Sequence, residues 1–143
     1  MLSTITKAAT NFCEHQIRKP YSLSDEMPKM RMFIASINIL ENNNTHKVYV
    51  AAPTELLQTL CEIFLFEDDC DEETLKDMLL EMTNMIVGSA KVIAQEENGA
   101  KKFDIRTPVF LDINDFNYPY DSEVNISIGD TNILVAIKEN DAA

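Results

Sequence analysis

The sequence has no tryptophan, only three glycines and five prolines, and half as many basic as acidic residues. So few glycines and prolines argue against a fibrous repeat or a disordered linker. The 12 lysines and arginines stand against 24 aspartates and glutamates, which gives a formal net charge of −12. This charge repels phosphate backbones, and no Lys/Arg cluster offers a local exception, so we expect no nucleic-acid partner.

Long apolar runs are also missing. No run approaches the ~20 residues that span a bilayer. Residues 1–7 lack the charged-then-apolar order of a secretory signal. We therefore expect a cytoplasmic protein with no membrane insertion. The 143 residues, 45% of them hydrophobic, are enough for a proper core, and the sequence predicts a single domain over residues 1–143.

Cysteine and histidine are too few and too scattered to indicate a metal site. Cys13, Cys61 and Cys70 are an odd number without Cys-x-x-Cys spacing, which argues against both a disulfide framework and zinc. His15 and His46 lie too far apart in sequence to indicate ligands, or a base beside a nucleophile. We expect free thiols and no metal held by this chain.

Apolar periodicity predicts three helices. The first is expected over residues 2–18, where the Lys-Pro pair that follows stops it. The second opens with Pro-Thr-Glu at 53–55 and should end near Phe66. The third, over about residues 72–96, is the longest, and Glu-Asn-Gly at 97–99 is a fitting stop.

Strands are expected in the β-rich segments 29–40, 46–51, 103–111, 124–128 and 132–137. The first two should form a hairpin through the polar turn 41–45, and the last two a hairpin through Gly129-Asp130. Pro108 interrupts the middle segment, and the tail from about Glu139 is expected to be frayed. The order of elements predicts an α+β fold with a mainly antiparallel sheet and the helices on one face.

The acidic run over residues 67–73 suggests calcium at first sight. It has no glycine at the sixth position of a calcium loop and no glutamate at the twelfth. Capping of the third helix by Asp69 or Asp71, followed by a solvated acidic first turn, explains the run better.

The third helix carries an unusual polar row. Asp77, Glu81, Asn84 and Gly88 follow one another at spacings of 4, 3 and 4, and at about 100° per residue they fall within roughly 40° on a helix surface. The apolar residues that should face the core on the other side are Leu75, Met78, Leu79, Met82, Ile86 and Ile93. A glycine inside a helix costs about 1 kcal/mol relative to alanine, so something is expected to approach this row closely.

The pattern Asp77-x-x-x-Glu81-x-x-Asn84, with Pro108 after 23 intervening residues, resembles the signature of the CheC, CheX and FliY phosphatases of bacterial chemotaxis. The small residues that follow Asn84 are also similar to the family helix. One motif rather than two, and the short chain, point to the CheX branch. The resemblance implies a CheX/CheC-like fold, with a long central helix and two further helices packed on the sheet.

The resemblance also implies a substrate, the aspartyl phosphate of a CheY-like receiver domain. Asn84 would orient the attacking water, and Glu81 would pair with the receiver's active-site lysine. The receiver is expected to bring its own divalent cation, Mg²⁺, so this chain needs no cofactor. A homodimer is a further expectation. The residues expected to bind the partner are Asp77, Met85, Gly88 and Pro108.

Other interpretations stay open at this point. A non-catalytic module of the same fold would bind a receiver or a flagellar protein without turnover. A structural subunit could use Met78, Met82 and Met85 as an oligomer contact, although core packing explains these residues more simply. The polar row could also be an ordinary solvated face, with Gly88 present only because another helix of the same domain crosses there.

Overall fold

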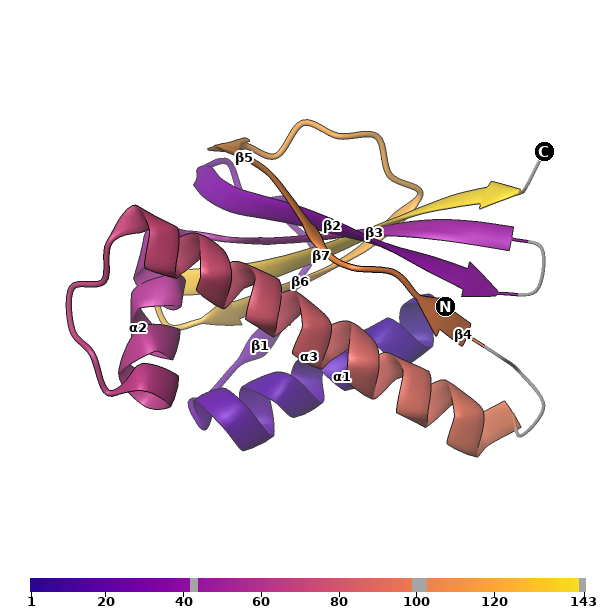
Figure 1. Cartoon of the computed structure of the whole chain (residues 1–143), viewed down its shortest axis with the longest axis horizontal. Helices are drawn as coiled ribbons and strands as arrows, with labels where there is room; N and C mark the ends of the chain where they lie inside the picture. The colour runs from indigo at the N-terminus through magenta and orange to yellow at the C-terminus, as the bar shows by residue number, and fades with distance from the viewer. Residues whose placement is uncertain (42–43, 99–102, 142–143) are drawn as a thin grey trace.

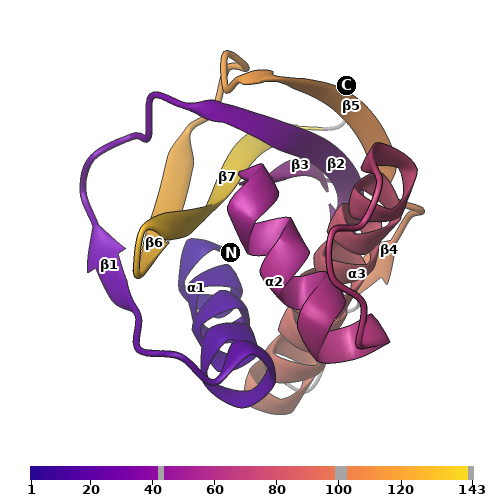
Figure 2. The ribbon, with the colours of Figure 1, turned by 90° about the vertical axis from the view of Figure 1, so that its left-hand side faces the viewer.

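One antiparallel sheet carries the fold, with the helices packed on one of its faces (Figures 1 and 2). A computed structural model describes residues 1–41, 44–98 and 103–141. Along the chain the elements are α1 (Leu2–Phe12), η1 (Cys13–Ile17), β1 (Ser22–Ser24), β2 (Arg31–Glu41), β3 (Asn44–Ala52), α2 (Thr54–Leu65), α3 (Glu72–Asn98), β4 (Phe103–Ile105), β5 (Val109–Asp115), β6 (Ser122–Ile128) and β7 (Thr131–Asp141). The predicted α+β class with helices on one face is confirmed.

The strand order is β1-β6-β7-β3-β2-β4, and β5 also pairs with β2. β4 and β5 share one edge of β2: β4 pairs with Ile39–Glu41 and β5 with Arg31–Ser36. The predicted strand 103–111 is therefore two strands. Pro108 lies at the break between them, where a residue without an N–H cannot extend the ladder.

Both predicted hairpins are present. β2 and β3 pair from Phe33↔Ala52 to Glu41↔Asn44, and residues 42–43 of the predicted turn lie outside the described residues. β6 and β7 are joined through Gly129, whose positive φ of 58° suits a glycine.

The tail from about Glu139 was expected to be frayed, and in the structure its first three residues are part of a strand. β7 continues to Asp141, which is paired with Asn44 of β3. The backbone N–H of Glu139 also donates to the Asp121 carboxylate at 2.7 Å. Backbone pairing across the sheet thus holds a segment whose sequence looks like a polar terminus.

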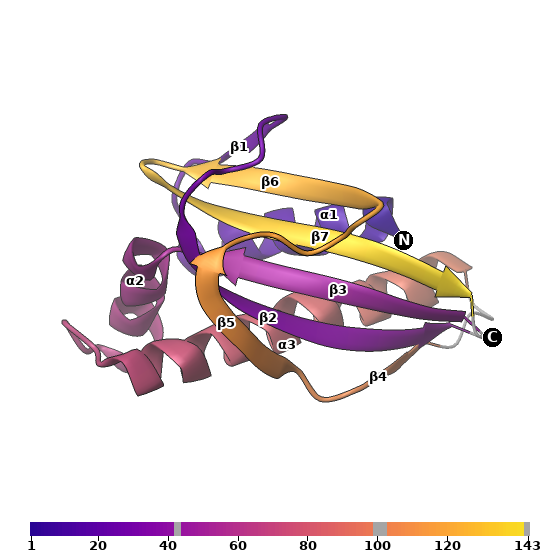
Figure 3. The same cartoon turned by 90° about the horizontal axis from the view of Figure 1, so that it is seen from above.

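α3 runs diagonally across the helix-covered face of the sheet (Figures 1 and 3). Its buried residues include five of the predicted stripe, Leu75, Met78, Leu79, Met82 and Ile86, and the sixth, Ile93, is partly buried against the same core. They pack in one core cluster with α1, α2 and the inner side of the strands. Because Met78 and Met82 are in the core, they are not available as an oligomer contact.

The other face of the sheet is also covered, which the sequence did not predict. The connection between β5 and β6 crosses it (Figure 3). Phe116 and Tyr118 from this connection pack on Tyr49 of β3, with ring centroids 5.5 and 5.0 Å away. A second, smaller core lies beneath, built on Met32, Ile34, Ala51 and Leu134.

Two helices end in a left-handed residue that is not glycine. The first helical stretch continues from α1 through the π-helical turn η1 and stops at Arg18, with φ 60°, just before the predicted Lys-Pro stop. α2 stops at Phe66, with φ 56°. For α3, the predicted stop includes Gly99, which lies outside the described residues.

Candidate functional site on helix α3

The start of α3 is fixed by its cap. The Asp71 carboxylate accepts a hydrogen bond from the Thr74 backbone N–H at 2.9 Å, so Asp71 is the cap of the two predicted alternatives. The hydroxyl and N–H of Thr74 lower the pKa of Asp71 below its usual value. In the ranges that the structure describes, His, Cys, Asp and Glu side chains form no group of three or more that could hold a metal ion.

The polar row predicted for α3 faces solvent. Asp77, Glu81 and Asn84 are all exposed, whereas the residues between them on the inner side are buried. Thr83, beside Asn84, is fully buried, and its hydroxyl donates to the Leu79 carbonyl at 2.8 Å. A carboxylate and an amide are thus presented three residues apart by a helix of 27 residues that is anchored in the core.

A groove of about 520 Å³ lies on one flank of the row, between α3 and the end of α2. Its lining residues are Phe64, Leu65, Thr74, Asp77, Met78, Glu81 and Met85. Figure 2 shows the end of α2 beside α3. Glu81 and Asp77 therefore stand on the wall of a concave surface, and the opposite wall is apolar.

A smaller groove of about 230 Å³ lies further along α3, against α1 and η1. It is lined by Ala8, Asn11, Phe12, His15, Gln16, Met85 and Ser89. Met85 lines both grooves, so the two hollows follow one another along the same side of α3. The polar row of Asp77, Glu81, Asn84 and Gly88 forms a ridge beside them. These walls were missed from the sequence because they come from other helices. The one available signal was the apolar pair Phe64-Leu65 at the end of the second helix.

Gly88 does not mark a helix crossing. A Cβ built on this glycine would meet no atom within 4 Å in the part of the chain that the structure describes. The internal-packing explanation is therefore wrong, and Gly88 leaves an open space on the same ridge. Its helical backbone does not require glycine either, because a positive φ is recorded only for Gly129 among the described glycines.

The structure does not bring Pro108 into either groove. It lies between β4 and β5, on the edge of the sheet. Nearby, Phe110 of β5 receives the Lys76 ammonium of α3 at 5.0 Å from its ring centroid. Pro108 is thus close in sequence to a contact that holds α3, but it is separate from the ridge.

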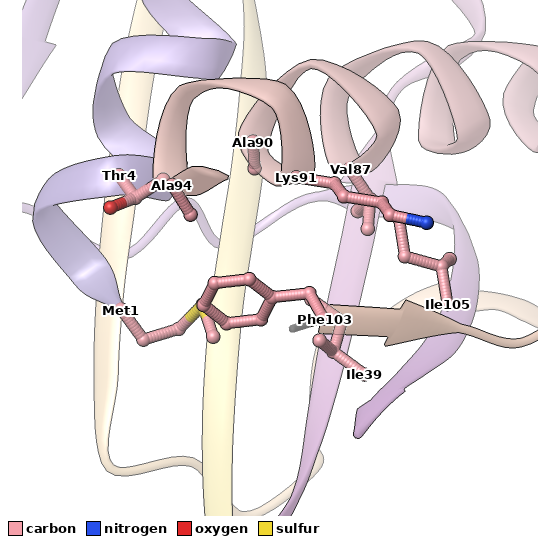
Figure 4. Close-up of a pocket in the computed structure, with 9 residues that line it drawn as sticks. All are labelled: Met1, Thr4, Ile39, Val87, Ala90, Lys91, Ala94, Phe103 and Ile105. Atoms are coloured by element: carbon pink, nitrogen blue, oxygen red, sulfur yellow. The ribbon is translucent and has the colours of Figure 1, made fainter. Parts of the chain in front are cut away.

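A third hollow is a defect of packing rather than a ligand site. Figure 4 shows apolar side chains from α3, β2 and β4 around it, among them Val87, Ile39 and Phe103. Its volume is only about 10 Å³, which is room for about one water molecule. The grooves beside α3 are the better candidates for a partner.

The family comparison covers this same region. The model for the chemotaxis phosphatase CheX matches residues 33–129, which include the whole ridge and Pro108. The chain belongs to the CheX family. The match to CheX confirms the resemblance drawn from the motif, and no curated protein matches the chain. Among the described residues, no helix is both long and apolar enough to cross a membrane.

Solved CheX structures share the fold along nearly the full length of the chain. CheX from Vibrio vulnificus is 18% identical, with a TM-score of 0.81 over 97% of this chain and 95% of that one. CheX from Borrelia burgdorferi, in a complex with CheY, BeF₃ and Mg²⁺, is 17% identical, with a TM-score of 0.73 over 98% and 97%. CheX from Desulfovibrio desulfuricans is 15% identical, with a TM-score of 0.73 over 96% and 97%. At these identities the likeness shows a common fold.

Proposed function

We propose that this protein hydrolyses the aspartyl phosphate of a CheY-like receiver domain. The observation that carries the proposal is the exposed pair Glu81 and Asn84 on the α3 ridge, within the region matched by the CheX model. The Borrelia relative crystallised with CheY, which supports a receiver as the partner class. The two grooves along this side of α3 leave room for loops of a partner beside the pair.

Asn84 acts on the attacking water. Its amide oxygen accepts a hydrogen bond from the water, and its NH₂ group can donate to a phosphoryl oxygen. The water oxygen bonds to phosphorus as the bond to the aspartyl oxygen breaks, which releases inorganic phosphate and the free carboxylate. Phosphoryl transfer depends mainly on in-line placement and charge neutralisation, so a fixed amide is sufficient. The divalent cation on the receiver neutralises phosphoryl charge, and this chain supplies no metal ligand.

Glu81 acts as an anchor. It lies nearly one turn before Asn84 and is exposed, so its carboxylate can reach a lysine of the receiver as a charge-assisted pair. Such a pair fixes the register of Asn84 against the phosphoryl group. Asp77 and Met85 line the adjoining groove and extend this contact, and Gly88 lets backbone of the partner lie close. For Pro108 we propose only that it shapes the neighbouring strand.

The test is phosphate release from purified CheY-like receivers phosphorylated with acetyl phosphate. We expect Asn84→Ala to lower kcat about 100-fold or more, since misplacement of the reacting group alone costs that much. The matched control is Asn117→Ala, an exposed asparagine on the connection across the other face of the sheet. For Glu81→Ala we expect a higher KM. Release that is equally fast with Asn84→Ala would reject the mechanism.

A non-catalytic binding module gives a different result in the same experiment. Wild-type protein would then bind a receiver activated with beryllofluoride but would not accelerate phosphate release. Homodimer formation and a cytoplasmic location stay predictions. Light scattering tests the first, and a mass of one chain in solution would contradict it.

A further inference from the structure

Phe66 is the most exposed of the large hydrophobic side chains in the described structure. It is 91% exposed, and Leu65 beside it is 43% exposed. Phe64 and Leu65 form the apolar wall of the groove that Glu81 and Asp77 line on the other side. Phe66 therefore directly follows a residue of the groove wall, and its ring contributes almost nothing to the core.

The backbone holds this ring out in solvent. Phe66 closes α2 in the left-handed conformation, φ 56° and ψ 33°, and its N–H donates to the Cys61 carbonyl. The turn that follows is tied back to α2, because the Gln58 side chain bonds both the N–H and the carbonyl of Cys70. Glycine or asparagine serves a left-handed helix end better than phenylalanine. The phenylalanine is thus costly for the fold and is presented on a fixed turn.

The surroundings of Phe66 are strongly acidic. Residues 64–81 contain eight acids and a single base, Lys76. Lys76 is engaged within the fold, 3.7 Å from Glu72 and 3.5 Å from Glu73. Asp68 and Asp69 are exposed in the same turn as Phe66. Phe66 and Leu65 therefore form an exposed apolar patch that is surrounded by carboxylates.

We propose that Phe66, with Leu65, is a second docking point for the receiver and decides which receivers are substrates. It inserts into an apolar depression of the receiver that is bordered by lysine and arginine side chains, beside the phosphorylation site. This inference rests on the proposed function, because Leu65, which precedes Phe66, lines the groove beside Glu81.

Charge disfavours the other occupants of this surface. A second copy of the chain would bring two acidic surfaces together in a symmetric contact, which like charges oppose. Anionic lipid surfaces and nucleic acids are repelled in the same way. A protein partner with a basic rim gains from the field, which speeds encounter and selects among partners.

Because Phe66 is separate from the reacting atoms, its loss weakens association and leaves chemistry unchanged. Buried aromatic anchors carry much of the affinity of an interface. We expect Phe66→Asn to raise KM about tenfold or more, with kcat within about twofold of wild type. Asparagine tolerates the left-handed backbone, so this variant should fold with an unchanged or higher Tm. Phe66→Trp should keep a low KM.

The contribution of the exposed carboxylates beside Phe66 is tested with Asp68→Asn combined with Asp69→Asn. We expect a higher KM at low salt, and a weaker rise of KM with salt than in wild type, because steering by exposed charges is screened by salt. The control is Leu23→Asn, which removes another exposed apolar side chain. Leu23 is 59% exposed and lies on β1, the edge strand opposite the β4 edge of the sheet. The control variant should have the KM of wild type and the same dependence of KM on salt.

The experiment measures kcat and KM with acetyl-phosphate-treated CheY-like receivers, and Kd with the same receivers activated by beryllofluoride. If Asn84→Ala abolishes release but Phe66→Asn keeps the wild-type KM and Kd, this inference is wrong and the proposed function stands. If wild type binds without release, a weaker Kd for Phe66→Asn still supports the docking point, and an equal Kd overturns it.

If wild type neither binds nor releases phosphate with any receiver, both proposals fall. A dimer that dissociates in Phe66→Asn would make the ring a self-contact and would also overturn this inference.

Discussion

The side-chain amide of Gln58 bonds both backbone groups of Cys70. Gln58 Nε2 donates to the Cys70 carbonyl at 3.0 Å, and the Cys70 N–H donates to Oε1 at 2.9 Å. One residue later, Asp71 caps α3. A single side chain of α2 therefore sets where α3 begins, and with it the placement of the ridge relative to the groove.

Removal of this amide should destabilise the protein. We expect Gln58→Ala to lower the free energy of unfolding by about 1–3 kcal/mol, because two partly buried backbone groups lose their partner. Urea denaturation followed by far-UV circular dichroism measures the change. The control is Gln95→Ala, an exposed glutamine on α3. Equal stability of the two variants would show that the turn does not depend on Gln58.

Gly88→Ala should separate stability from function. The structure leaves room for the added Cβ, and alanine is favoured over glycine inside a helix by about 1 kcal/mol. We therefore expect a higher Tm together with a higher KM for phosphorylated receivers. The contrasting control is Gly129→Ala, where φ is 58° and we expect a loss of about 1 kcal/mol or more. A more stable Gly88→Ala protein with unchanged KM would show that no partner backbone comes close to this position.

The cap at Asp71 should give a pH-dependent contribution to stability. Hydrogen bonds from Thr74 hold the pKa of Asp71 below its usual 3.8 in the folded state. The unfolded chain therefore takes up the proton first, so the cap contributes fully well above pH 3.8 and its contribution is lost as pH falls through the folded-state value.

The Tm difference between wild type and Asp71→Ala should accordingly be largest near neutral pH and shrink below pH 3.8. Thermal denaturation at several pH values measures it. Asp71→Asn is the matched variant, since its amide oxygen still accepts the Thr74 N–H. A difference that stays constant down to pH 3 would mean that the charge on Asp71 is irrelevant.

The three thiols should differ in reactivity. Burial raises the pKa of Cys13 to about 12, and burial together with a hydrogen bond to the Cys70 thiol raises the pKa of Cys61 to about 12. The thiolate is the reactive form. Iodoacetamide at pH 8 should therefore modify the partly exposed Cys70 first, and Cys13 and Cys61 only after unfolding in urea. Mass spectrometry of peptides identifies the sites; early labelling of Cys13 in the native protein would contradict its burial.

The helices were predictable because each buries a long periodic stripe. The end of the second helix near Phe66 and the start of the third at Glu72 were both predicted correctly. Short or polar strands gave no such signal. β1 has only three residues, Ser22–Ser24, and the end of β7 is polar, so pairing with distant strands decides their structure.

The polar row of the candidate site could also be read from the sequence, since it depends only on helical periodicity. The hollows beside it could not, because they require α1 and α2 to lie against α3. Gly88 illustrates the limit: periodicity places it on the row, but only the packed structure shows that no other helix crosses it. The roles of Glu81 and Asn84 stay predictions until the variants are measured.

The aromatic cluster on the far face of the sheet offers a built-in optical reporter. Three of the four tyrosines, 49, 118 and 120, belong to it, and the chain has no tryptophan. Near-ultraviolet signals from these rings monitor folding of the sheet face remote from the helices. In the Phe66→Trp protein, excitation at a wavelength that tryptophan absorbs and tyrosine does not would report on position 66 alone in this chain, so docking of a receiver without tryptophan could be watched in real time without a dye.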